Sequence, residues 1–140
     1  MKPIYRNILA IVLGLVLGSF INMYIVGFSA DQLGLDPNDP EYMTKLGEVL
    51  PSASSDKFIY PFAAHAVGTL VGALIAAMIA GTHKMKIALA IGAFFLLGGI
   101  MASVMIPSPL WFIVVDILFA YIPMAFIGGW IGQKFSKPSV

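Results

Sequence analysis

The 140-residue sequence contains no cysteine, and charged residues are scarce. Without cysteine the chain has no disulfides, no thiolate metal ligands and no thiol nucleophile. Charged residues make up 11% of the chain, against about 25% in soluble globular proteins. So few polar side chains leave little material for catalysis, and we expect no enzymatic activity, no catalytic residues, no metal site and no cofactor.

Several binding functions are also excluded by what is missing. The formal net charge is only +1, and no cluster of lysine and arginine interleaved with aromatics is present, so nucleic acid is not an expected partner. The sequence has no phosphate-binding loop, no dinucleotide-binding glycine motif and no nucleophile triad.

Hydrophobic residues are what the chain has in abundance. They make up 59% of it, and the mean hydropathy is +0.93. A bilayer is crossed by a helix of about 20 apolar residues, and four stretches qualify: 8–28, 58–81, 87–106 and 110–132. We therefore predict an all-α fold, a four-helix membrane bundle in a single integral membrane domain covering 1–140, with the lipid bilayer as its first partner.

The distribution of charge predicts how the bundle is oriented. Lysine and arginine collect on the cytoplasmic side of membrane proteins. On one side of the predicted spans lie Lys2, Arg6, Lys84, Lys86, Lys134 and Lys137; on the other lie six acidic residues with only Lys45 and Lys57. Both termini are therefore expected in the cytoplasm, with loop 29–57 outside, in a plasma membrane such as the bacterial inner membrane. The first apolar stretch is longer than the usual signal-peptide core of about 7–15 residues, which favours a retained helix.

The external loop is expected to contain one short amphipathic helix. Asp39 is a suitable N-cap, Pro40 suits the first helical position and Pro51 ends the pattern. The apolar residues in between fall on one face, so this helix would lie on the membrane surface or cover the bundle.

Small residues recur every fourth position along three of the predicted spans. Such stripes let helix backbones approach closely in lipid, within a chain or between chains. The packing positions expected from this pattern are Gly14, Gly18, Gly68, Gly72, Ala76, Gly128 and Gly132. They favour a protein that works by helix–helix association.

Polar residues within the spans gather at a common depth. Counting from the predicted outer ends, His65 and Asp116 both lie seven residues in, or about 10 Å along a helix. Asn22 and Ser103 lie in the same outer half. One turn deeper are Ser19 and Thr69. Ionisable groups within a membrane normally face the bundle interior and find partners, so we predict an intramembrane polar cluster with a His65–Asp116 hydrogen bond at its centre.

Three interpretations of this cluster stay open. It is a structural clasp that fixes helix register, a protonatable or cation-binding site open to the outside, or a place where His65 ligates a haem, which would need a second copy of the chain or another ligand. Pro123 should kink the fourth span one to two turns below Asp116, and we expect it to act as a hinge.

The function that the pattern favours is therefore non-catalytic. We expect a small integral membrane protein that acts by association, as a homo-oligomer or as an accessory subunit of a larger membrane complex. The alternative is a small proton- or cation-coupled transporter or channel that uses the Asp116, His65 and Asn22 cluster.

Overall fold

The computed structural model describes residues 1–136, and over these residues the chain is helical with no strand. Four helical segments are long and apolar enough to cross a membrane: Pro3–Leu33, Ser55–Ile79, Lys84–Met105 and Leu110–Phe135. The elements are α1 (Pro3–Leu33), α2 (Tyr42–Val49), η1 (Leu50–Ser52), η2 (Ser55–Phe58), α3 (Ile59–Ile79), α4 (Lys84–Met105), α5 (Leu110–Phe119) and α6 (Ile122–Phe135). The prediction of an all-helical chain with four apolar, membrane-length helices is confirmed.

Helix α1 is longer than the apolar stretch that predicted it. It has 31 residues, begins at Pro3 and ends at Leu33, and its C-cap is Gly34, whose φ of 68° is left-handed. The Gly34 N–H closes the last turn on the carbonyls of Ala30 and Asp31. Because this glycine cap lies beyond the apolar stretch, the connecting loop starts at 34 instead of 29.

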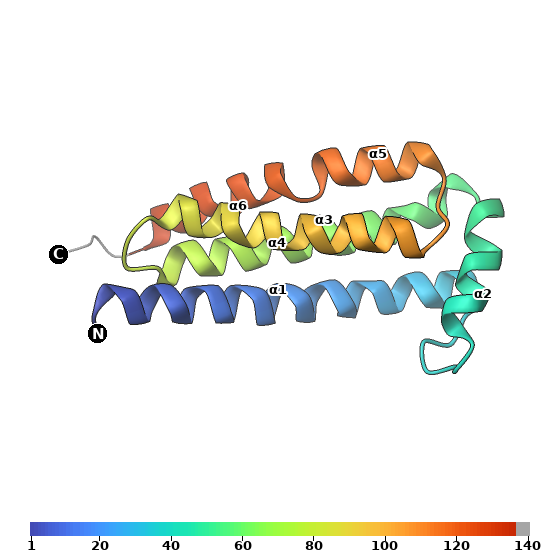
Figure 1. Ribbon diagram of the computed structural model, residues 1–140, viewed down its shortest axis with the longest axis horizontal. Helices are drawn as coiled ribbons and strands as arrows, with labels where there is room; N and C mark the ends of the chain where they lie inside the picture. The colour runs from blue at the N-terminus through green and yellow to red at the C-terminus, as the bar shows by residue number, and fades with distance from the viewer. Residues whose placement is uncertain (137–140) are drawn as a thin grey trace.

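Helix α3 is the centre of the bundle and packs against α1, α4 and α6. In its most apolar stretch 44% of the residues are buried, against 17% in α1. Helix α2 lies across one end of the long helices (Figure 1). We call this the loop end, and the opposite end, where residues 80–83 join α3 to α4, the turn end.

The small-residue stripes hold the long helices together within the chain. A Cβ added at Gly14 would lie 2.7 Å from the carbonyl oxygen of Gly72, and one added at Gly18 would lie 2.7 Å from that of Gly68. On the other side of α3, a Cβ at Gly132 would lie 2.5 Å from the carbonyl oxygen of Leu74. A Cβ added at Gly128 would lie equally close to the carbonyl oxygen of Leu70. Glycine is therefore required where α1 and α6 contact α3.

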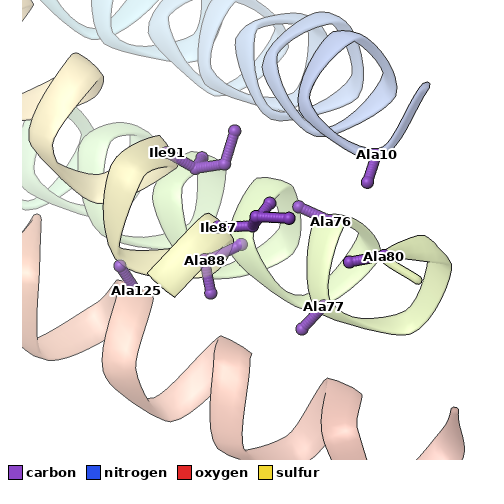
Figure 2. Close-up of a cluster of buried hydrophobic side chains, with 9 residues drawn as sticks. Ala10, Ala76, Ala77, Ala80, Ile87, Ala88, Ile91 and Ala125 are labelled. Atoms are coloured by element: carbon purple, nitrogen blue, oxygen red, sulfur yellow. The ribbon is translucent and has the colours of Figure 1, made fainter. Parts of the chain in front are cut away.

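The core near the turn end consists mainly of alanine. Its buried members are Ala10, Ala73, Ala76, Ala77, Ala80, Ile87, Ala88, Ile91 and Ala125, contributed by α1, α3, α4 and α6. Figure 2 shows these short side chains converging between the helices. Such small residues bring the backbones close enough to fill the space between them.

Hydrogen bonds from α1 close the turn end. Asn7 Oδ1 accepts from the backbone N–H groups of Gly81, at 2.9 Å, and Thr82, at 3.1 Å. Arg6 Nε donates to the carbonyl oxygen of Ile79 at 3.1 Å. The bond from Arg6 satisfies a carbonyl group that the end of α3 leaves free, and Asn7 satisfies two N–H groups of the turn. The start of α1 is thereby fixed to the turn between α3 and α4.

The fourth apolar segment is interrupted. Helix α5 ends at Phe119 and α6 begins at Ile122, with Pro123 in its first turn. Tyr121, at the junction, has a φ of −116° and a ψ of −80°, outside helical values. Proline lacks the N–H that would continue α5, and its ring restricts the preceding backbone, so the break lies just before Pro123.

The loop contains an eight-residue helix, α2, which starts two residues later than Pro40 would suggest. Glu41 occupies the N-cap position, while Asp39 Oδ1 accepts from the Glu41 N–H at 2.8 Å in the preceding turn. Asp39 therefore caps that turn instead of the helix. Leu46 and Leu50 are buried against Phe58 and Phe112, so the apolar face of α2 packs on the loop end of the bundle.

Candidate functional site

A histidine and an aspartate from two different helices form the centre of the site. His65 comes from the second turn of α3, and Asp116 from the last turns of α5. The Nδ1 atom of His65 lies 2.8 Å from Asp116 Oδ1 and 3.0 Å from Oδ2. Both residues lie the same number of positions from the loop ends of their helices, and packing of α3 and α5 at this level brings them into contact.

A third side chain, Tyr121, completes the cluster and is not found by sequence reasoning. Its hydroxyl donates to Asp116 Oδ2 at 2.7 Å, and its ring stacks on the His65 imidazole with centroids 5.7 Å apart and planes inclined by 28°. In an unbroken helix, a residue five positions after Asp116 would be rotated about 140° away from it. The break at Ala120–Tyr121 turns the tyrosine back toward the carboxylate.

The hydrogen bonds assign a role to each atom. Asp116 accepts from the tyrosine hydroxyl and from the imidazole, which is the pattern of a carboxylate with Nδ1 of His65 protonated. The side chain of Asp116 is 7% exposed and that of His65 is 23% exposed. The other imidazole nitrogen, Nε2, has no hydrogen-bond partner among residues 1–136 and is not enclosed by protein atoms.

A cavity of about 130 Å³ lies between these groups and the loop end. His65, Asp116 and Gly99 are among its lining residues farthest from the loop end along their helices. Toward the loop, the cavity is covered by Tyr42 and Leu46 of α2. The rest of the lining is mainly apolar and includes Val26, Leu50, Phe58, Ile106, Phe112, Ile113 and Ile117, together with Ser29, Ser103 and Ser108.

The other predicted polar residues do not join the hydrogen-bonded group. Asn22 packs against α3, where its Cβ lies 2.9 Å from the Cβ position of Gly68. Ser103 lines the cavity, and its hydroxyl donates to the Ile100 carbonyl at 2.7 Å. Within residues 1–136, neither Asn22 nor Ser19 makes a side-chain hydrogen bond. Of the six predicted cluster residues, only His65 and Asp116 are therefore bonded to each other.

Thr69, one turn below His65 on α3, is a separate case. It is completely buried, and its Oγ1 has no hydrogen-bond partner in the described part of the chain. A buried unpaired hydroxyl is uncommon in proteins. Thr69 lies between the His65–Asp116 pair and the alanine core, whose first residue on α3 is Ala73.

The site offers one exchangeable position and no metal-binding set. Among residues 1–136, no three potential metal ligands lie together. The oxygens of Asp116 accept hydrogen bonds from His65 and Tyr121, and Nε2 is the nitrogen of the imidazole that has no partner within residues 1–136. An imidazole oriented by a carboxylate on one nitrogen can take up and release a proton on the other.

No family model matches the chain, and neither does any curated protein or solved structure.

Proposed function

We propose that the protein is a small proton-coupled membrane transporter or channel whose exchangeable proton is carried by His65 and Asp116. This is the alternative expectation from the sequence, and it now takes precedence over association. The observation that carries it is that His65 lines a cavity and has an unpartnered Nε2 within residues 1–136, next to a buried carboxylate that orients the ring through Nδ1.

The cavity supports this function because it is large enough for water. A water molecule takes about 30 Å³ in the liquid, and the cavity measures about 130 Å³. Water in this space would reach His65 and Ser103, which supply polar contacts. A purely structural clasp would need neither the space nor an accessible nitrogen.

A proton fits the site better than a metal cation. Small cations are held by several oxygen ligands, and Asp116 is the only carboxylate that lines the cavity among residues 1–136. A proton needs only the one free nitrogen. We therefore place no cation at Asp116, and we assign the chain no enzymatic step.

Orientation is part of the same proposal. We expect the turn end in the cytoplasm and residues 34–58 outside, because lysine and arginine collect on the cytoplasmic side of membrane proteins. The cavity would then receive protons from the external side. The alanine and glycine core near the turn end would separate the cavity from the cytoplasm in this conformation.

The test is to follow the His65 ring nitrogens by NMR in lipid between about pH 5 and pH 9. We expect the imidazole to change protonation state reversibly, and the transition to move in Asp116→Asn. His83, which lies in the turn at the opposite end and is exposed, serves as the internal control. The groups facing His65 are Asp116 and Tyr121, with Tyr42 lining the same cavity.

A flux measurement completes the test. In vesicles that contain a pH-sensitive dye, an external acid pulse should acidify the interior faster with the wild-type protein than with Asp116→Asn. Asp31→Asn, which changes an exposed aspartate outside the cluster, should behave like the wild type. An imidazole fixed in one protonation state across the range, or equal fluxes for all three proteins, would refute the proposal.

Association with itself or with another membrane subunit is the second candidate. The glycine stripes that suggested it are occupied inside the chain, so a partner would have to bind a different face. Helix α1 offers one, because Phe20, Met23 and Tyr24 are each more than 60% exposed. Single-molecule photobleaching of labelled protein in dilute vesicles would decide. A single bleaching step per vesicle would exclude a homo-oligomer.

A further inference from the structure

The cavity has a size and a chemical character that the uptake of a proton alone does not require. A proton site needs water and one basic atom. This space is instead bounded by Phe58, Phe112, Ile106, Ile113 and Ile117 on several sides, with the accessible imidazole at one position. Its volume and apolar lining therefore allow an occupant larger than water.

The volume limits how large that occupant is. An engineered protein cavity of about 150 Å³ binds benzene, and this cavity measures about 130 Å³. It thus suits a molecule built on one six-membered ring, with six or seven heavy atoms. A longer chain or a fused ring system would have to displace α2.

The charges around the cavity favour a neutral molecule. Among residues 1–136, its lining includes no lysine and no arginine, and the one carboxylate there is hydrogen-bonded to His65 and Tyr121. Moving an unpaired ion into such an apolar space costs far more than moving a neutral ring. A ligand with a full charge is therefore disfavoured.

The polar end of the cavity favours a hydroxyl group. With Nδ1 donating to Asp116, Nε2 of the neutral imidazole is a hydrogen-bond acceptor. A ligand hydroxyl would donate to it. Ser103 keeps acceptor capacity on its oxygen, because its own hydrogen is directed to the Ile100 carbonyl.

From these observations we propose that the cavity binds a neutral, single-ring alcohol or phenol whose hydroxyl donates to Nε2 of His65. The ligand would occupy the same site as the proposed proton. The proposal rests on the proposed function only because both use the imidazole of His65.

The test compares two molecules that differ in one group. Cyclohexanol carries the hydroxyl, and methylcyclohexane replaces it with a methyl group of similar size. Each is titrated at equal mole fraction in the bilayer into vesicles that contain the protein, at a fixed pH where His65 is neutral. The Nε2 resonance of His65 should shift saturably with cyclohexanol and stay in place with methylcyclohexane, while His83 should not respond to either.

A cavity-filling variant provides the control. Ala102 lines the cavity from α4 and makes no part of the hydrogen-bonded cluster. Ala102→Leu should reduce the cyclohexanol response at least tenfold while the pH titration of His65 in the absence of ligand persists. Equal shifts with both molecules, no saturation with cyclohexanol, or an unchanged response in Ala102→Leu would overturn this inference. None of these results would affect the proton titration on which the proposed function depends.

Discussion

The two ends of this bundle are both apolar but differ in the size of their side chains. Near the turn end, alanine and glycine bring four helices into close contact around Ala76 and Ala77, both with zero exposure. Near the loop end, larger side chains such as Phe58 and Phe112 leave a cavity beneath α2. Small residues therefore produce the dense half of the molecule, and large residues the hollow one.

The comparison explains where an ionisable pair can be placed. A histidine and an aspartate in the alanine core would have no room for water and no route to it. Set beside the cavity, His65 keeps one nitrogen accessible while Asp116 stays almost fully covered. The dense half holds the long helices together, and the cavity lies in the other half, beside the pair.

The largest effect is expected from adding atoms to the dense contact between α1 and α3. Gly18→Leu would place side-chain atoms where the Gly68 carbonyl already lies 2.7 Å from the Cβ position. We expect a loss of about 3 kcal/mol or more, because neither backbone can move without separating the helices. Thermal unfolding in detergent, followed by circular dichroism, measures it.

Gly27 on the same helix is the matched control. A Cβ there meets no atom of residues 1–136 within 4 Å. Gly27→Leu should leave the unfolding midpoint within a degree or two of the wild type. Equal losses for the two variants would show that the stripe does not carry the α1–α3 contact.

The next effect concerns the tyrosine that joins the cluster. Tyr121→Phe removes the hydroxyl that donates to Asp116 Oδ2 at 2.7 Å. Hydrogen bonds to charged groups contribute about 1.5–3 kcal/mol, so we expect a loss in that range together with a displaced pH titration of His65. Tyr24→Phe, on the exposed face of α1, should change neither quantity. A Tyr121→Phe protein with wild-type stability and titration would exclude the tyrosine from the site.

One substitution made in both halves sharpens the comparison further. Ala76→Val enlarges a side chain with zero exposure in the dense core, and we expect it to cost about 1–3 kcal/mol. Ala102→Val adds the same atoms beside the cavity, where space exists, and should cost less than about 0.5 kcal/mol. Similar losses at the two positions, measured by the same unfolding assay, would contradict the contrast between the halves.

The smallest effect is expected at the loop, where Lys45 hydrogen-bonds Asp39 before α2. That bond lowers the pKa of the Asp39 carboxyl from its ordinary value. For an acid with a lowered pKa, the stabilisation is complete above the unfolded-state pKa of about 3.9 and is lost as the pH falls through the lower folded value. At neutral pH the ion pair is therefore fully formed.

Asp39→Asn should loosen α2 at neutral pH and make no difference in strong acid. Since the pair is exposed, we expect amide hydrogen exchange in residues 42–49 to rise by only about two- to fivefold. Asp31→Asn is the control, because the Asp31 side chain makes no hydrogen bond or ion pair within residues 1–136. No difference between the two variants would mean that packing of Leu46 and Leu50 alone holds α2 in place.

The fold was predictable to the extent that it depends on apolar length. Four long apolar stretches and the turn residues between them define four helices, and the spacing of small residues identifies Gly14, Gly18, Gly68 and Gly72 as packing positions. Which surfaces those glycines contact was not predictable, since a stripe has the same pattern whether it faces its own chain or another. The end of α1 was missed because Gly34, its cap, lies beyond the apolar residues.

The site was predictable only in part, for a geometric reason. Depth along a helix can be counted, which places His65 and Asp116 at one level. The direction in which a side chain points around the helix axis can be counted only while the helix is continuous. The break at Ala120–Tyr121 changes that direction for Tyr121. Tyr121 therefore could not be assigned from its spacing to Asp116. Asn22 lies at a similar depth to His65 and Asp116. It packs against Gly68 because α1 and α3 are in close contact there.

The interruption before Pro123 has a mechanical consequence. Helix α6 is locked to α3 through Gly128 and Gly132, whereas α5 is packed far more sparsely. Asp116 belongs to the sparsely packed α5, Tyr121 lies at the break between α5 and α6, and His65 belongs to the central helix α3. A tilt of α5 about the break at Ala120–Tyr121 would move the Asp116 carboxylate away from the His65 imidazole. The packing of α1, α3, α4 and α6 near the turn end would not have to change. In this arrangement, the carboxylate of Asp116 and the imidazole of His65 belong to segments that could move relative to each other.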